Sequence, residues 1–115
     1  MKVVSAASVA GSGQGGGELK VLLSGANAGV KHGILGLARV APGARLPATG
    51  YSCHACEEFS YMIVGKVRVW VEGEEAVLGP GDALIIYPGE RHYVINEAEE
   101  TAETVWVLAP PIPLD

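Results

Sequence analysis

The sequence predicts an all-β protein, an antiparallel sandwich or barrel of short strands. Three observations support this fold class. Residues 67–72 alternate apolar and polar side chains with period 2, which is typical of a half-buried strand. The chain holds 16 Gly and 7 Pro among 115 residues, and they fall between apolar runs as turn residues do. Few segments show the period of an amphipathic helix.

About eight segments read as strands when the chain is followed in order. A short hairpin turn at 65–66 separates two of them, and stronger turn signals stand at 79–82, where Gly-Pro-Gly-Asp occurs, and at 88–91. An acidic turn is expected after residue 96. The predicted strands are 19–23, 34–40, 58–64, 67–72, 75–78, 83–87, 92–96 and 104–109.

The length predicts one domain over residues 1–115, because a chain of this size buries a single core. We expect the core at about 19–109. Residues 1–17 form an N-terminal segment, and residues 110–115 form a Pro-rich tail that cannot continue a central strand. The tail is expected to pack along the surface or to reach a partner subunit.

Charge and cysteine content exclude several classes of protein. The formal net charge is -5 and the Lys and Arg residues are scattered, so no nucleic-acid partner is expected. No apolar run approaches the roughly 20 residues of a spanning helix, so no membrane partner is expected. The N-terminus only weakly resembles a signal peptide, and the two cysteines, three apart, cannot join distant segments. We therefore expect a cytoplasmic protein.

Three residues of types common in metal sites are candidates for the chemistry. His54 and Glu58 lie four apart at the entry to one predicted strand, and His92 opens a later strand. If the chain is extended, Glu58, Ser60 and Met62 face inward with His54 near the mouth of the barrel. Two imidazoles and one carboxylate leave coordination positions free for water, oxygen or substrate.

Two segments around these residues resemble the motifs of the cupin family. Residues 52–65 resemble the first motif, His-x-His-x3-Glu-x6-Gly, and residues 81–96 resemble the second, Gly-x5-Pro-x-Gly-x2-His-x3-Asn. The chain departs from the pattern at Ser52, where the family has His, and at Tyr87, where it has Pro. The resemblance implies a small jelly-roll barrel, a double-stranded β-helix that is often a homodimer. It also implies one divalent ion, Fe, Zn, Mn, Ni or Cu, bound by His54, Glu58 and His92.

The fourth ligand position stays open. Ser52 is a poor ligand when neutral, although three protein ligands and a water still make a plausible catalytic site. Cys56 lies two residues from both His54 and Glu58, so an extended chain would place it on their face, and a thiolate would favour zinc or copper. If neither Cys53 nor Cys56 binds the metal, they are two free thiols or form a local disulfide.

The resemblance leaves three functions open. The first is a metal-dependent enzyme of dioxygenase, isomerase or lyase type acting on a small organic molecule. The second is a non-catalytic cupin that binds or senses a small ligand with weak or no metal, and the third is a structural dimer. No residue stands out as a general base, and only Glu58 and Tyr61 are inward candidates. Asn96 is a candidate for a hydrogen bond behind the metal ligands.

Overall fold

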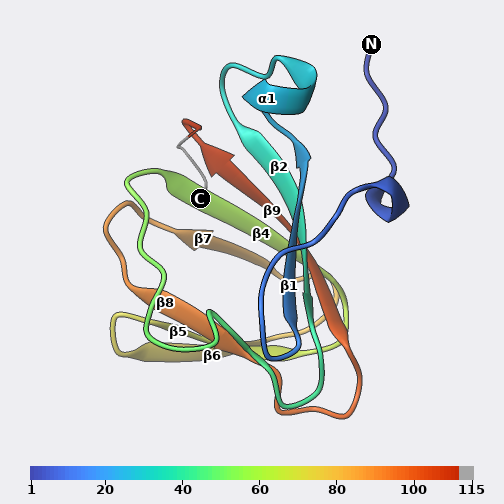
Figure 1. The fold of residues 1–115 in the computed structure, drawn as a ribbon. Coiled ribbons are helices and arrows are strands. Elements are labelled where there is room, and N and C mark those ends of the chain that lie inside the picture. The colour runs from blue at the N-terminus through green and yellow to red at the C-terminus, as the bar shows by residue number, and fades with distance from the viewer. Residues whose placement is uncertain (112–115) are drawn as a thin grey trace.

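Two antiparallel sheets face each other across the interior of the protein (Figure 1). The computed structural model describes residues 1–111. One sheet has five strands in the order β1-β2-β9-β4-β7, and the other has four in the order β3-β8-β5-β6. The predicted all-β class is confirmed, and the two-sheet arrangement is a jelly-roll barrel.

All eight predicted strands are present, and their ends differ from prediction by no more than two residues. Each is bounded by the turn signals that the sequence shows. The strands are β1 (Gly17–Leu23), β2 (Ile34–Val40), β3 (Arg45–Leu46), β4 (Glu57–Val64), β5 (Val67–Val71), β6 (Glu74–Leu78), β7 (Ala83–Ile86), β8 (His92–Ile95) and β9 (Ala102–Ala109).

Three short elements were not predicted. Strand β3 pairs only Arg45 with Ile95 and Leu46 with Val94, which is too short to show a period in sequence. A one-turn helix, α1 (Gly25–Ala28), begins where the Ser24 N–H donates to Asn27 Oδ1 at 2.8 Å. A single 3-10 turn, η1 (Ala6–Ser8), lies in the N-terminal segment.

The β4–β5 hairpin requires glycine at position 65. Gly65 has φ 76°, in the left-handed region that favours glycine. A Cβ there would also stand 2.8 Å from the Cα of Ala102 on β9. The hairpin can therefore fold tightly against β9, the strand next to β4 in the five-stranded sheet.

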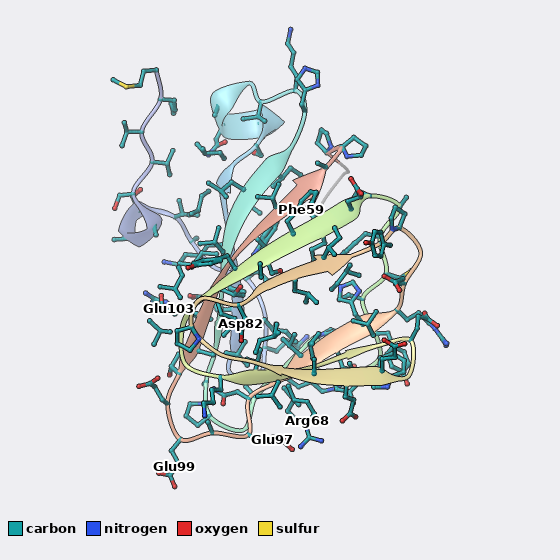
Figure 2. The ribbon with its side chains drawn as sticks, turned by 180° about the vertical axis from the view of Figure 1, so that it is seen from behind. Phe59, Arg68, Asp82, Glu97, Glu99 and Glu103 are labelled. Carbon is teal, nitrogen blue, oxygen red and sulfur yellow. The ribbon has the colours of Figure 1, made fainter. Side chains whose placement is uncertain are left out.

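The core lies between the sheets and consists of two clusters of buried side chains. Alternation along β4 points Glu58, Ser60 and Met62 inward, as predicted, and leaves Phe59 and Tyr61 outside. One cluster contains Ile34, Ala38, Cys56, Trp106 and Leu108, and the other contains Val40, Ala44, Met62, Val67 and Ala102. On the far side of the four-stranded sheet, Arg68 pairs with Glu97 (Figure 2).

The prediction that Asn96 supports the metal ligands is wrong. Asn96 is fully buried, and its Nδ2 donates to the carbonyl oxygens of Val40 and Glu100, both at 2.8 Å. Its Oδ1 accepts the Ala98 N–H at 2.9 Å. Two of these hydrogen bonds therefore shape the acidic turn between β8 and β9, and the bond to Val40 ties the turn to β2.

Two further expectations concern the C-terminal tail and membrane-spanning helices. Residues 112–115 of the predicted tail lie outside the described residues. Within residues 1–111, no helix has the length and apolar character needed to cross a membrane.

Candidate metal centre

The structure brings His54, Glu58 and His92 together at one end of the barrel, from both sheets. Glu58 is the second residue of β4 and pairs with Leu108 of β9 and Ile86 of β7, so two neighbouring strands fix its position. His92 is the first residue of β8 in the opposite sheet. His54 lies in the loop before β4, and its carbonyl accepts the Gly89 N–H at 2.8 Å.

The donor atoms of these three side chains converge on one point. Nε2 of His54 is 3.4 Å from Glu58 Oε1, and Nε2 of His92 is 3.6 Å from the same oxygen. One ligand atom from each residue lies within 4.8 Å of the others. Their side chains are 25%, 18% and 7% exposed in the order His54, Glu58, His92, so the group is reachable but mostly shielded from solvent.

A backbone contact orients the His92 ring. Its Nδ1 lies 3.0 Å from the carbonyl oxygen of Glu90, which accepts only if Nδ1 carries the proton. In the neutral His92 ring, Nε2 then carries the lone pair and directs it toward Glu58. This is the arrangement by which proteins usually fix the tautomer of a metal-binding histidine.

The charges of the group are coupled. Burial raises the pKa of Glu58, but the contacts with His54 and His92 and their positive charge outweigh burial and lower it to about 2. Burial lowers the pKa of His92, but the contacts with Glu58 and with the Glu90 carbonyl reverse this and raise it. A carboxylate is therefore held ionised, and it favours a cation between the two rings.

The spacing and chemistry of the donors fit a divalent ion. Two ligands each about 2.1 Å from a tetrahedral ion lie about 3.4 Å apart, close to the 3.4 Å and 3.6 Å found here. The same distances are long for good hydrogen bonds. Two imidazoles and a carboxylate suit zinc, iron, manganese, nickel or copper, and they leave positions open.

The two candidates for a fourth ligand have different positions. The backbone of Ser52 exchanges both N–H···O bonds with His92, at 2.9 Å each, which puts the two side chains on the same face, and both line the cavity described below. Cys56 is only 2% exposed and packs among apolar side chains, outside the donor group. Burial raises the pKa of its thiol. Both Cys53 and Cys56 are free, with no disulfide between them.

A cavity of about 650 Å³ runs between the sheets from the three donors. This volume is typical of a site for a small organic ligand. Most of its wall is apolar, with Ser60, Thr104 and Trp106 among the polar exceptions.

One expectation about this wall is wrong, and one part of the wall was not predicted. The prediction of Tyr61 as an inward general base is wrong, because its side chain is 53% exposed on the outer face of β4. Residues 12–14 line the cavity, although they belong to the N-terminal segment. An isolated bridge between Ser12 and Leu19 joins them to β1, and the Gly17 N–H donates to the Gln14 carbonyl at 3.2 Å. A Gly-rich segment carries no periodic signal that could have predicted these contacts.

Comparison with known proteins identifies the family. The model of the Cupin domain family matches residues 36–108, so the chain belongs to the cupins. It is 32% identical over 110 residues to tetracenomycin polyketide synthase protein TcmJ of Streptomyces glaucescens, covering 96% of this chain and 72% of that protein. It is 35% identical over 98 residues to polyketide synthase CurC of Streptomyces cyaneus, covering 85% of this chain and 62% of that one.

A solved structure shares the fold. The polyketide cyclase RemF from Streptomyces resistomycificus superposes with a TM-score of 0.82 and 22% sequence identity, over 99% of this chain and 82% of that one. At this identity the likeness concerns the fold alone.

Proposed function

We propose that this protein is a mononuclear, divalent-metal enzyme that acts on a polyketide-like molecule, a small carbon chain or ring system bearing several oxygens. The observation that carries the proposal is the convergence of His54, Glu58 and His92 within 4.8 Å at the end of an apolar cavity. The names of two relatives, both polyketide synthase proteins, support the substrate class.

The chain's own residues would bind and orient the substrate. His54, Glu58 and His92 would hold the ion, whose identity among Fe, Zn, Mn, Ni and Cu is open. When bound, such an ion supplies a Lewis acid that polarises a carbonyl oxygen, or in the case of iron a site for dioxygen. The apolar wall around Met62, Leu84 and Ile86 excludes water and shapes a flexible polyketone.

The reaction type we favour is lyase- or isomerase-like ring closure. A methylene carbon between two carbonyls is already acidic, so its deprotonation needs a polarised carbonyl more than a strong base. This matters because His54, Glu58 and His92 would be engaged as ligands, and Glu103, which also lines the cavity, pairs with Arg39 at 3.3 Å. The new carbon–carbon bond is followed by loss of one water as the ring becomes aromatic.

One observation favours a second candidate, a non-catalytic cupin that binds a small ligand with weak or no metal. Ser52 lies on the same face as His92 and contributes only a neutral hydroxyl. Ser52→His would add an imidazole there. If three ligands already hold the ion, this variant should bind the metal more tightly without being required for binding.

We also propose a homodimer formed through the outer face of the five-stranded sheet. Phe59, Tyr61 and Ile63 are 43%, 53% and 46% exposed on β4. A row of exposed apolar side chains of this kind is typical of an interaction surface. Light scattering after gel filtration should give twice the chain mass for the native protein and the chain mass for Tyr61→Lys. The chain mass for both proteins would reject the dimer.

The enzymatic proposal is tested with one substrate mimic and matched variants. Metal-stripped protein is reloaded with each of the five ions and incubated with methyl 3,5,7-trioxooctanoate. Ring closure between C2 and C7 releases one water and is followed by mass spectrometry. We expect acceleration over buffer with at least one ion, loss in Glu58→Gln, and no change in Glu57→Gln, whose side chain is exposed.

The other outcomes discriminate among the alternatives. Oxygen consumption by the iron form without ring closure would support the dioxygenase type instead. Tight metal and ligand binding with no turnover for any ion would favour the binding cupin. Failure to retain any ion would reject the metalloenzyme.

A further inference from the structure

Ser60 places a hydroxyl on the inner wall of the five-stranded sheet, beyond the metal candidates. Its side chain faces inward between those of Glu58 and Met62 on β4, and it lines the cavity. Because two residues along a strand span about 7 Å, Ser60 stands about 7 Å further into the barrel than Glu58. Ser60 is half-buried, so it lies in the path of a ligand that extends inward from the three donors.

The neighbours of Ser60 on the two adjacent strands are apolar or turned away from it. The strand register puts Leu84 of β7 on one side of Ser60 and Trp106 of β9 on the other. The indole of Trp106 packs against β2, on the side of β9 away from Ser60, because a Cβ added to Gly36 would lie 2.0 Å from its Cζ2. Met62, the next inward residue of β4, is apolar and 2% exposed. This part of the wall therefore surrounds one hydroxyl with apolar surface.

The Ser60 hydroxyl is available to a ligand. Within residues 1–111 it forms no hydrogen bond with the protein, and its oxygen is not a buried atom left without a partner, so it is accessible from the cavity. Two other polar side chains of the cavity wall are already engaged. Thr104 Oγ1 donates to the carbonyl oxygen of Tyr61 at 3.1 Å, and Glu103 pairs with Arg39 at 3.3 Å. An oxygen that a ligand brings to this part of the wall would therefore meet Ser60 as its hydrogen-bond donor.

We propose that the Ser60 hydroxyl donates a hydrogen bond to an oxygen of the bound ligand, at the edge of the ligand that lies away from the metal. This inference rests on the proposed function, because it assumes that one end of the ligand is held at His54, Glu58 and His92. It narrows the substrate class to elongated, largely apolar molecules with an oxygen function at each of two opposite edges. Ser60 is thereby a specificity-determining residue, since a ligand without the far oxygen covers its hydroxyl and leaves it unpaired.

A matched pair of probes tests the far oxygen. 1,8-Dihydroxyanthraquinone has a chelating hydroxy-ketone edge and a second carbonyl opposite, and 1,8-dihydroxy-9-anthrone lacks only that second carbonyl. Binding of both to zinc-loaded, full-length protein is measured without dioxygen. We expect the preference for the quinone over the anthrone to be about tenfold greater in the native protein than in Ser60→Ala, as one hydrogen bond allows. Comparing the two ratios cancels any difference in chelating strength between the probes. The native ratio should persist in Thr104→Val, whose hydroxyl is already bonded to the backbone.

Infrared difference spectroscopy of the bound quinone gives a direct readout of the hydrogen bond. A hydrogen bond to a carbonyl oxygen weakens the C=O bond and lowers its stretching frequency. The band of the far carbonyl should therefore lie at lower frequency in the native protein than in Ser60→Ala. The band of the chelating carbonyl should be the same in both proteins, because its contact is with the ion. A change in the general fold of the variant would not move one carbonyl band and spare the other.

The outcomes separate this inference from the proposed function. The same ratio of affinities in the native protein and in Ser60→Ala, or a far-carbonyl band at the same frequency in both, would overturn it. Binding of neither probe by protein that retains zinc would also overturn it while leaving the metal site standing. Failure of the native protein to retain zinc or any other ion would overturn the proposed function itself, and the role of Ser60 with it.

Discussion

Removing the charge of Glu58 should change how the stability of the metal-free protein depends on pH. Glu58→Gln keeps the size of the side chain and removes its titration. The pKa of Glu58 is lowered from its ordinary value of 4.5 to about 2 by His54 and His92, in spite of burial. A lowered carboxyl pKa gives stability that is present above pH 4.5 and is lost as the pH falls toward 2.

The size of the effect follows from the same two values. The interval from 4.5 to about 2 corresponds to about 3 kcal/mol at 1.36 kcal/mol per pH unit. By linkage, about 2 kcal/mol of this is already lost at pH 3. The raised pKa of His92 describes the same contact from the other side, so it is not added. Its contribution is present below pH 6.5 and is lost as the pH rises through the raised value.

The assay is urea unfolding of chelator-treated protein between pH 3 and pH 8. Between pH 6 and pH 3, the native chain should lose about 2 kcal/mol more unfolding free energy than Glu58→Gln. Glu57→Gln, a neighbouring change on an exposed side chain, should follow the native curve. The difference isolates Glu58, because all other carboxyl groups titrate in both proteins. Parallel curves for native chain and Glu58→Gln would refute the coupling of Glu58 to the two histidines.

Three other predictions concern the scaffold. Gly36→Ala should lower the free energy of unfolding by about 1–3 kcal/mol, because the new Cβ would lie 2.0 Å from the Trp106 indole. Gly79→Ala, whose Cβ would have its nearest neighbour at 3.9 Å, should change thermal unfolding little, and equal effects of the two variants would contradict the packing. Asn96→Ala should lower the free energy of unfolding by about 3 kcal/mol, because three hydrogen bonds are lost, and should leave the metal stoichiometry unchanged. A loss of metal without a loss of stability would instead show that Asn96 supports the metal site. Iodoacetamide should label the exposed Cys53 of the folded protein and spare Cys56, whose thiol pKa is raised by burial. Mass spectrometry identifies the labelled cysteine, and faster labelling of Cys56 would contradict the prediction.

Much of the fold was predictable because strand pattern and turn chemistry agree. The period-2 run in β5 and the Gly-Pro-Gly-Asp turn before β7 each mark their element locally. Two features without a local sequence signal were not predicted correctly. Strand β3 has two residues, and the role of Asn96 depends on a backbone carbonyl of β2 that lies 56 residues away. Contacts at such separations leave no mark in a single sequence.

The site was predictable for its inward side chains and less so for its surroundings. Pleating alone puts Glu58 and Ser60 on one face and excludes Tyr61, so naming both Glu58 and Tyr61 as inward residues ignored the period of the strand. Cys56 stands just before β4 and shares the inward alternation of His54 and Glu58, but it packs into the apolar cluster instead of joining the donor group. Its apolar neighbours come from β2 and β9.

Whether His54, Glu58 and His92 bind one divalent ion can be measured directly as the metal content of the protein. Native protein, His92→Ala and His32→Ala are purified without a tag, reloaded, dialysed and analysed by elemental mass spectrometry. His32 is an exposed histidine outside the donor group and serves as the matched control. We expect one ion per chain in the native protein and in His32→Ala, and none in His92→Ala. Equal metal in all three proteins, or none in any of them, would contradict it.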